Sequence, residues 1–122
     1  MRILFALTVV ILTFGCSDND DEFDSSCGVV NPTRQLEWLK AEINDLQSNQ
    51  SDISKYFYVS QALYNSETVF LFNNCCPFCN TVVPIYNCAG TQLGTLNNEI
   101  SEGDILNNKI VYQPDNFQCH TN

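Results

Sequence analysis

The chain has 122 residues, with 14 acidic and 5 basic side chains and a formal net charge of −9 at pH 7. This length fits one small domain. The acidic balance and the lack of a basic patch argue against nucleic acid and against anionic membrane surfaces as partners.

The first 15 residues have the layout of a secretory signal. Arg2 supplies a positive charge, the apolar run 3–14 follows, and Gly15 stands before Cys16. The run is shorter than the roughly 20 residues that span a bilayer. We expect residues 1–15 to be removed and Cys16 to become the lipidated first residue. The alternative is an uncleaved anchor or a buried helix.

Residues 16–26 are expected to form the lipidated cysteine and an acidic, disordered tether. The pattern around Cys16, with Thr13 where the lipidation signal usually has Leu, resembles lipoproteins of Bacteroidetes-type bacteria. Residues 17–22 resemble the acidic export signal of some lipoproteins of that phylum. These resemblances imply an outer-membrane protein exposed on the cell surface. A periplasm-facing position is the alternative.

Six cysteines remain for the expected domain at 27–122, and an even number in an oxidising compartment indicates up to three disulfides. Cys75 and Cys76 are adjacent, so in extended backbone they point to opposite faces and need different partners. We expect Cys75 and Cys76 each to form a disulfide with one of the cysteines near the ends of the domain, Cys27 and Cys119. The two remaining cysteines are expected to form a local third bond. The six candidates are Cys27, Cys75, Cys76, Cys79, Cys88 and Cys119, with Cys79–Cys88 as the local pair.

A helix is predicted over residues 32–47. Asn31 is a suitable cap, and Pro32 fits the first helical position, where no amide donor is needed. An apolar stripe facing a core follows, and it consists of Leu36, Leu39, Ile43 and Leu46, with Trp38 at its edge.

Strand-like runs follow at 56–64, 68–72, 81–86, 91–96 and 109–113. Asn65-Ser66-Glu67 predicts a hairpin, and Pro84 predicts an edge strand or a bulge. A helix followed by strands, without βαβ alternation, predicts an α+β fold. We expect one N-terminal amphipathic helix packed on a small antiparallel β meander and braced by disulfides.

Several spaced residues resemble small uncharacterised lipoproteins of Bacteroidetes. They are Trp38-Leu39, the Cys75-Cys76 pair, Ile85-Tyr86-Asn87-Cys88 and Gly90. The resemblance covers residues 36–112. It implies a location at the outer membrane or cell surface and no particular activity.

The motif Cys76-Pro77-Phe78-Cys79 is the strongest chemical candidate, and it is similar to a glutaredoxin active site. A redox CxxC begins a helix after a strand, but here a β-prone segment containing Pro84 follows. We therefore expect structural disulfides and no catalytic residues. The alternatives are thiol–disulfide exchange by Cys76 and Cys79, or metal binding by Cys75, Cys76, Cys79, Cys88 and His120.

The remaining polar and aromatic groups suggest surface roles. Three carboxylates in the loop 97–108 are expected to be solvated, with calcium binding as the alternative, and these are Glu99, Glu102 and Asp104. His120 is expected at the surface. Three tyrosines form a candidate ligand face for a glycan or a protein, and these are Tyr56, Tyr58 and Tyr64.

These observations favour a non-enzymatic binding or accessory domain on a lipid anchor. Its expected partners are the membrane, through the N-terminal lipid, and a surface protein or glycan. No metal and no cofactor are expected. The alternatives are the thiol–disulfide oxidoreductase and an inhibitor-like module whose loop around residues 77–80 blocks a target enzyme.

Overall fold

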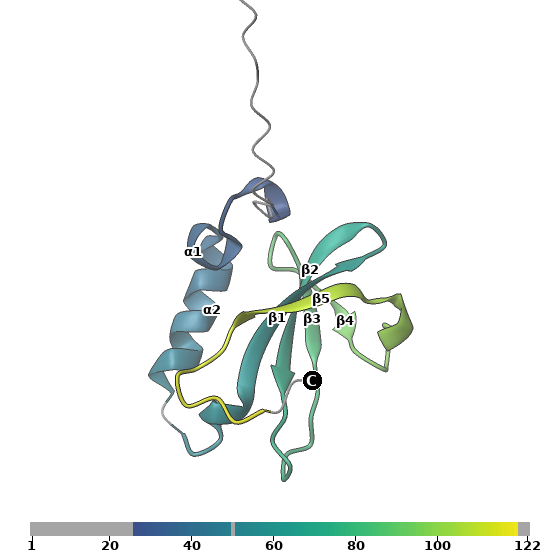
Figure 1. Cartoon of the computed structure of the whole chain (residues 1–122). Helices are drawn as coiled ribbons and strands as arrows, with labels where there is room; N and C mark the ends of the chain where they lie inside the picture. The colour runs from purple at the N-terminus through teal and green to yellow at the C-terminus, as the bar shows by residue number, and fades with distance from the viewer. Residues whose placement is uncertain (1–25, 50, 120–122) are drawn as a thin grey trace, which may run out of the picture.

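The fold is α+β, with helices beside a five-stranded antiparallel sheet (Figure 1). The computed structural model describes residues 26–49 and 51–119. Two helices, α1 (Pro32–Gln35) and α2 (Glu37–Ser48), precede the strands in this part of the chain. The strands are β1 (Phe57–Tyr64), β2 (Glu67–Asn74), β3 (Pro84–Asn87), β4 (Gln92–Thr95) and β5 (Leu106–Tyr112). Short 3-10 turns lie at Ser26–Gly28, Ser54–Tyr56 and Glu102–Asp104.

The predicted helix is interrupted at one residue. Leu36 has an extended backbone (φ −83°, ψ 110°), and it ends α1 and starts α2. Pro32 occupies the first turn as expected, but the Asn31 side chain does not cap the helix. It accepts a hydrogen bond from the Thr33 hydroxyl instead, at 2.8 Å.

The sheet has the order β4-β3-β2-β1-β5, so the expected meander describes only its first four strands. β5 crosses over to pair with β1, antiparallel, at the side away from β2. The β1–β2 hairpin is closed by Asn65 and Ser66, both at positive φ (49° and 64°), as a two-residue type I′ turn requires. Glu67, which we had placed in the turn, pairs with Tyr64 as the first residue of β2.

The prediction of an edge strand at Pro84 is wrong, because β3 lies between β2 and β4. Pro84 is tolerated there since it is the first residue of the strand. It stands opposite Thr95 of β4, whereas pairing with β2 starts only at Ile85. The predicted bulge has a counterpart one residue further on, where the register with β4 shifts between Ile85 and Tyr86.

Each face of the sheet carries its own apolar core, because neighbouring side chains along a strand point to opposite faces. On the helix face, Leu39 and Ile43 of α2 pack on Val59 and Phe70. Leu36 and Leu46 pack against the same cluster, so the predicted stripe is confirmed. On the other face, the connection from β4 to β5 covers a second cluster, which consists of Ala62, Val69, Leu71, Ile85 and Ile100.

Trp38 joins the helix to the β3–β4 turn. Its indole N–H donates to the Cys88 carbonyl oxygen at 2.8 Å, and its ring packs edge-on against Phe70 with the centroids 5.8 Å apart. Gly90 has a φ of +80°, and a Cβ added there would lie 2.8 Å from the indole. The structure thus places Trp38, Cys88 and Gly90, three of the residues behind the lipoprotein resemblance, in mutual contact.

All six domain cysteines form disulfides, but only part of the expected pairing is correct. The bonds are Cys27–Cys88, Cys75–Cys119 and Cys76–Cys79. Cys75 and Cys76 do have different partners, and Cys75 does bond to a terminal cysteine. The expected Cys79–Cys88 pair and a bond from Cys27 to the Cys75-Cys76 pair are wrong.

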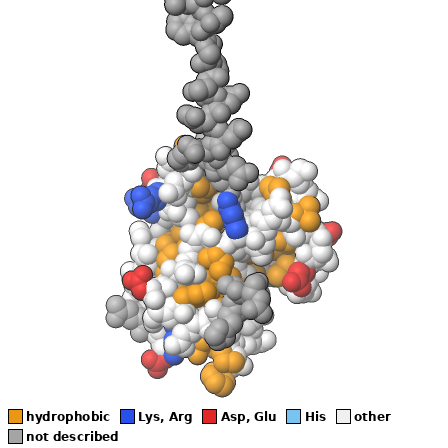
Figure 2. Space-filling view, viewed as in Figure 1, with side chains coloured by type: hydrophobic (Ala, Val, Ile, Leu, Met, Phe, Trp, Pro, Cys, Tyr) orange, Lys and Arg blue, Asp and Glu red, His pale blue; other side chains and the backbone are white. Residues whose placement is uncertain are grey.

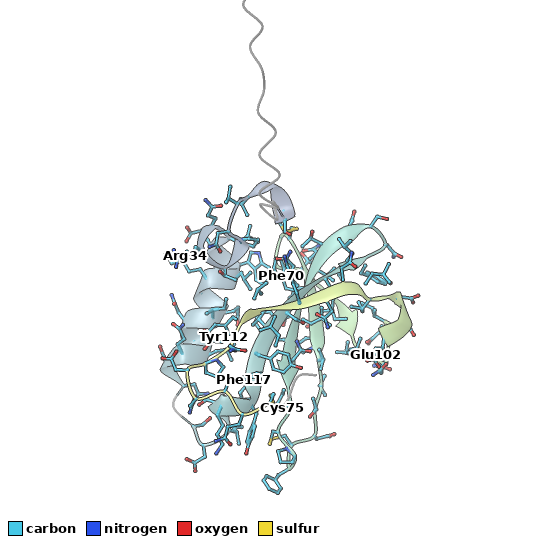
Figure 3. All side chains as sticks on the ribbon, viewed as in Figure 1. Arg34, Phe70, Cys75, Glu102, Tyr112 and Phe117 are labelled. Carbon is cyan, nitrogen blue, oxygen red and sulfur yellow. A yellow bond between two sulfur atoms is a disulfide. The ribbon has the colours of Figure 1, made fainter. Side chains whose placement is uncertain are left out.

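The antiparallel register of β2 and β3 explains the correction. Asn87 pairs with Val69 near the start of β2, so the following Cys88 lies at that end of the sheet, with its sulfur 3.8 Å from the Thr68 carbonyl oxygen. Cys75 and Cys79 follow the other end of β2, which Figure 3 shows beside the returning C-terminal segment with Phe117. A bond from Cys79 to Cys88 would have to cross the length of the strand pair.

The first described residue is held against β1 by a hydrogen bond. Ser26, which we had assigned to the tether, is buried, and its hydroxyl oxygen accepts a hydrogen bond from the Gln61 side-chain amide. The first residue that the structure describes is therefore already part of the folded unit.

Candidate functional site

The motif 76–79 forms a turn closed on itself by a disulfide, with 5.3 Å between the Cα atoms of Cys76 and Cys79. The Cys79 amide donates to the Cys76 carbonyl oxygen at 3.4 Å. The Cys76 amide donates to the side-chain oxygen of Asn74, the last residue of β2, at 2.8 Å. The end of the strand therefore holds the start of the turn in place, and the disulfide closes it.

The surroundings of this disulfide differ from those of a redox CxxC. A reactive thiolate is favoured by partial exposure and by a helix N-terminus that lowers its pKa. Here Cys76 is only 5% exposed, and the chain runs from Cys79 into β3 with no helix between them. The bond is therefore buried at Cys76 and lacks the helix N-terminus that accompanies a redox CxxC.

The other chemical candidates stay dispersed. In residues 26–49 and 51–119, no group of three or more His, Cys, Asp or Glu side chains is arranged to hold a metal ion. His120 lies outside the described residues. The exposed Glu99 carboxylate accepts hydrogen bonds from the hydroxyl and amide of Thr95, at 2.7 and 2.8 Å. These bonds hold the pKa of Glu99 below its ordinary value, first through the hydroxyl.

The three tyrosines of the candidate ligand face do not form one row. Tyr58 and Tyr64 stand near opposite ends of β1, about 20 Å apart at the rise of a strand. Tyr58 packs edge-on against Phe117, with the ring centroids 5.4 Å apart, and Tyr64 packs against the second core. Tyr56 lies in the turn before β1, with the Lys55 ammonium 5.3 Å from its ring centroid. All three side chains are half-buried.

The most exposed large apolar side chain of the described residues lies inside the disulfide-closed turn. Phe78 is 90% exposed, and Val82, four residues later, is 61% exposed. We call residues 75–83 the Phe78 loop. It extends past the end of the sheet in Figure 1, and Figure 2 shows hydrophobic side chains at this lower end of the domain. Phe78 and Val82 thus place two exposed apolar side chains on one loop.

A hollow of about 300 Å³ adjoins this loop, and we call it the apolar hollow. It arises because β2 pairs with β3 only over Val69–Leu71, so that the end of β2 and the chain leading into β3 diverge. Its walls are mostly apolar or aromatic and include three asparagines. The lining residues are Leu46, Phe57, Tyr58, Phe72, Asn73, Asn74, Asn80, Val82 and Pro84.

Two side-chain amides in this wall already make hydrogen bonds within the chain. The Asn73 side-chain nitrogen, which is buried, donates to the Ser60 hydroxyl at 2.8 Å and to the Leu71 carbonyl oxygen at 3.1 Å. Asn74 accepts from the Cys76 amide, as described above. Asn80 is exposed on the Phe78 loop. The hollow therefore presents a preformed, mainly apolar wall with one exposed amide at its rim.

Sequence reasoning missed this surface, although a signal for it exists. Residues 68–98 contain no Asp, Glu, Lys or Arg, in a chain that carries 14 acidic and 5 basic residues. The sequence predicts a role for this loop in sulfur chemistry or, in the inhibitor-like alternative, in blocking a target enzyme, but it does not single out Phe78 or the hollow. An exposed apolar surface lacks charged groups, so the long uncharged stretch is compatible with one, although the same stretch also contains β3 and most of β2, which supply buried core residues.

A larger hollow, of about 620 Å³, lies between the end of α2 and the segment after β5. Its lining is mainly polar and includes Asp52, Lys55 and Asp115. Tyr112 also lines it, and burial, followed by the nearby Asp115 carboxylate, raises the pKa of this phenol above its ordinary 10.0. Charged side chains therefore line this hollow, unlike the uncharged wall beside the Phe78 loop.

The lipidation candidate Cys16 and most of the acidic segment after it lie outside the described residues. Within residues 26–49 and 51–119, neither helix combines the length and the apolar character that crossing a membrane requires.

The chain matches no protein-family model, and comparison with curated proteins and with solved structures gives no match either.

Proposed function

We propose that this chain is an exported lipoprotein whose domain is a non-enzymatic binding or accessory module. Cys16 carries the lipid, and residues 17–25 connect it to the domain. The anchor holds the domain at the outer membrane, on the cell surface. Three disulfides within one small domain support export, because such bonds persist in oxidising compartments.

The observation that carries the binding role is Phe78, 90% exposed in a turn that its own disulfide closes. Moving the Phe78 ring from water into an apolar contact is favourable. The Cys76–Cys79 disulfide already restricts the backbone of the turn, so binding loses less conformational entropy than it would from an open loop. The Phe78 loop and the apolar hollow together form the contact surface of the domain. Its partner presents an uncharged, apolar surface.

Cross-linking in intact cells tests the proposal. The full chain is expressed with its signal in cells supplied with photoreactive leucine, whose carbene inserts into apolar groups on irradiation, and is compared with the Phe78→Ser and Leu106→Ser variants. Leu106 is a matched control, because it is 59% exposed and lies on β5, away from the Phe78 loop. We expect a covalent adduct in the wild type and in Leu106→Ser that decreases at least tenfold in Phe78→Ser. Equal adduct in all three, or none in the wild type, would overturn the contact surface.

The non-enzymatic part has its own test. A thiol-specific reagent should find no free thiol among the six domain cysteines of the native chain. Insulin reduction by a dithiol should proceed no faster with the chain than without it. Turnover that is lost in a Cys76→Ala/Cys79→Ala variant would instead establish the thiol–disulfide oxidoreductase.

The exposed, disulfide-closed turn also favours one second candidate, the inhibitor-like module, in which Phe78 enters the cleft of a target enzyme. Assays of a panel of secreted hydrolases, with the wild type and Phe78→Ser side by side, test it. Inhibition that requires Phe78 would support this candidate, and no inhibition of any member would count against it.

A further inference from the structure

The Phe78 loop combines a projecting side chain and a cavity within a few residues. Phe78 projects into solvent, whereas Asn80, Val82 and Pro84 of the same connection line the apolar hollow. The hollow, of about 300 Å³, is large enough to admit a phenyl ring. Each copy of the chain therefore carries both halves of an apolar contact, side by side.

The absence of charge on this surface allows a second copy to be the occupant that fits both halves. Each chain has a formal net charge of −9, so two copies repel wherever their acidic surfaces meet. The Phe78 loop belongs to the uncharged stretch 68–98, and none of the described residues that line the apolar hollow is charged. This is a surface on which two such acidic chains can approach without direct contact between like charges.

We infer that two copies of this chain associate through a two-fold contact in which Phe78 of each copy enters the apolar hollow of the other. The arrangement is isologous, so both contacts form together and the assembly closes at two copies. This inference rests on the proposed function and names the partner of its contact surface.

The contact is small. One loop and one hollow supply less than the roughly 800 Å² per partner of a stable interface. Pairing is therefore weak between free chains, and it becomes populated when lipid anchors hold many copies on one surface and raise their effective concentration. In the wall, the Asn73 side-chain nitrogen and the Asn74 side-chain oxygen already have hydrogen-bond partners within the chain, so these two atoms need none from the entering ring.

Photo-cross-linking of the full, membrane-anchored chain tests the inference. Phe78 is replaced by the photoreactive residue p-benzoylphenylalanine, and the same replacement at Leu106 is the control. On irradiation we expect a product of twice the chain mass only from position 78. Its cross-linked peptide should contain Phe57, Tyr58 or Phe72 of the second copy.

A pair of variants tests the geometry without relying on loss of function alone. Phe78→Lys brings a cation to the hollow of the other copy, and Val82→Glu places a carboxylate in the hollow itself. For these variants the photoreactive residue is placed at Asn80, at the rim of the hollow, and each variant alone should lose at least tenfold in the yield of the paired product. Differently tagged copies of the two variants in one membrane should pair with each other. Attraction between the introduced ammonium and the introduced carboxylate then replaces one of the two apolar contacts.

The outcomes separate the inference from the proposed function. A cross-link from position 78 to a different protein would overturn the second copy as the partner and leave the contact surface standing. Position 78 giving no cross-link at all would overturn both. If each variant alone gave as much paired product as the wild type does, the two-fold contact would be overturned. Intact disulfides, measured as the absence of free thiols, show that each variant is folded.

Discussion

The three disulfides should differ sharply in what they contribute to stability, because they close loops of very different length. Cys27 and Cys88 are 61 residues apart, whereas Cys76 and Cys79 are 3 apart. In the chain-entropy model, these closures stabilise the domain by about 4.3 and about 1.5–2 kcal/mol respectively. Cys75–Cys119, with a separation of 44, is expected at about 4 kcal/mol.

The perturbation is a double replacement of each bond, Cys27→Ala/Cys88→Ala against Cys76→Ala/Cys79→Ala. Double variants leave no unpaired thiol that could exchange with the remaining bonds. The difference of about 2.5 kcal/mol corresponds to a difference of about 10–20 °C in Tm for a domain of this size. Urea unfolding of the full chain, followed by circular dichroism and by Trp38 fluorescence, measures both free energies.

The dependence on urea supplies an internal check. Releasing a long closure expands the unfolded chain, so the slope of the unfolding free energy against urea should rise in Cys27→Ala/Cys88→Ala. It should stay almost unchanged in Cys76→Ala/Cys79→Ala. Equal destabilisation of the two variants, or the larger loss in the second, would refute the argument from loop length.

Four further predictions concern single residues. Gly90→Ala should cost about 2–4 kcal/mol in urea unfolding, because φ is +80° and the new Cβ meets Trp38. Ser66→Gly should add about 0.5–1 kcal/mol by relieving a φ of +64° in the hairpin turn. Tyr112, with a raised pKa, favours folding while it is neutral; its stabilisation is complete below pH 10 and is lost as pH rises through the folded-state pKa. Cys16→Ser should release the chain from the membrane fraction.

Each of these has a control or a contradicting result. Gly103→Ala, where the nearest atom to a new Cβ is 3.9 Å away, should stay within about 0.5 kcal/mol of wild type. Destabilisation by Ser66→Gly would contradict the turn assignment. Tyr112→Phe should reduce the alkaline loss of stability, and an unchanged loss above pH 10 would exclude this phenol as its source. A membrane-bound Cys16→Ser chain would contradict lipid anchoring.

Local pattern predicted the elements well. The stripe at Leu39 and Ile43 and the aromatic run of β1 carry the helical and strand periods that burial imposes, so their positions agree with the structure within a few residues. The sequence did not predict the break between α1 and α2 at Leu36, because the helical spacing of apolar residues continues through it. The pairing of β5 with β1 is a long-range tertiary contact, so no local turn pattern in the sequence predicts it.

The prediction of which cysteines pair was partly wrong for a related reason. Which cysteine meets Cys88 depends on which end of the sheet it occupies, and that follows from the register of β2 and β3 rather than from spacing. The sequence did not single out Phe78 for the proposed contact surface, because the exposure of its side chain is a property of the folded turn. An aromatic residue between two cysteines is equally compatible with a core position until the divergence of β2 and β3 is known.

The bond Cys27–Cys88 also determines how the domain bears mechanical load. A pull on the chain ahead of Cys27 passes through the disulfide into the end of β3, a strand with neighbours on both sides. The helices and the β1–β2 hairpin lie inside the closed loop, so such a pull cannot unravel them in sequence. About 200 Å of extended chain is thereby withheld from stretching. In a domain tethered from that end, the helices and the first three strands are not extended by the pull until the Cys27–Cys88 bond itself is reduced.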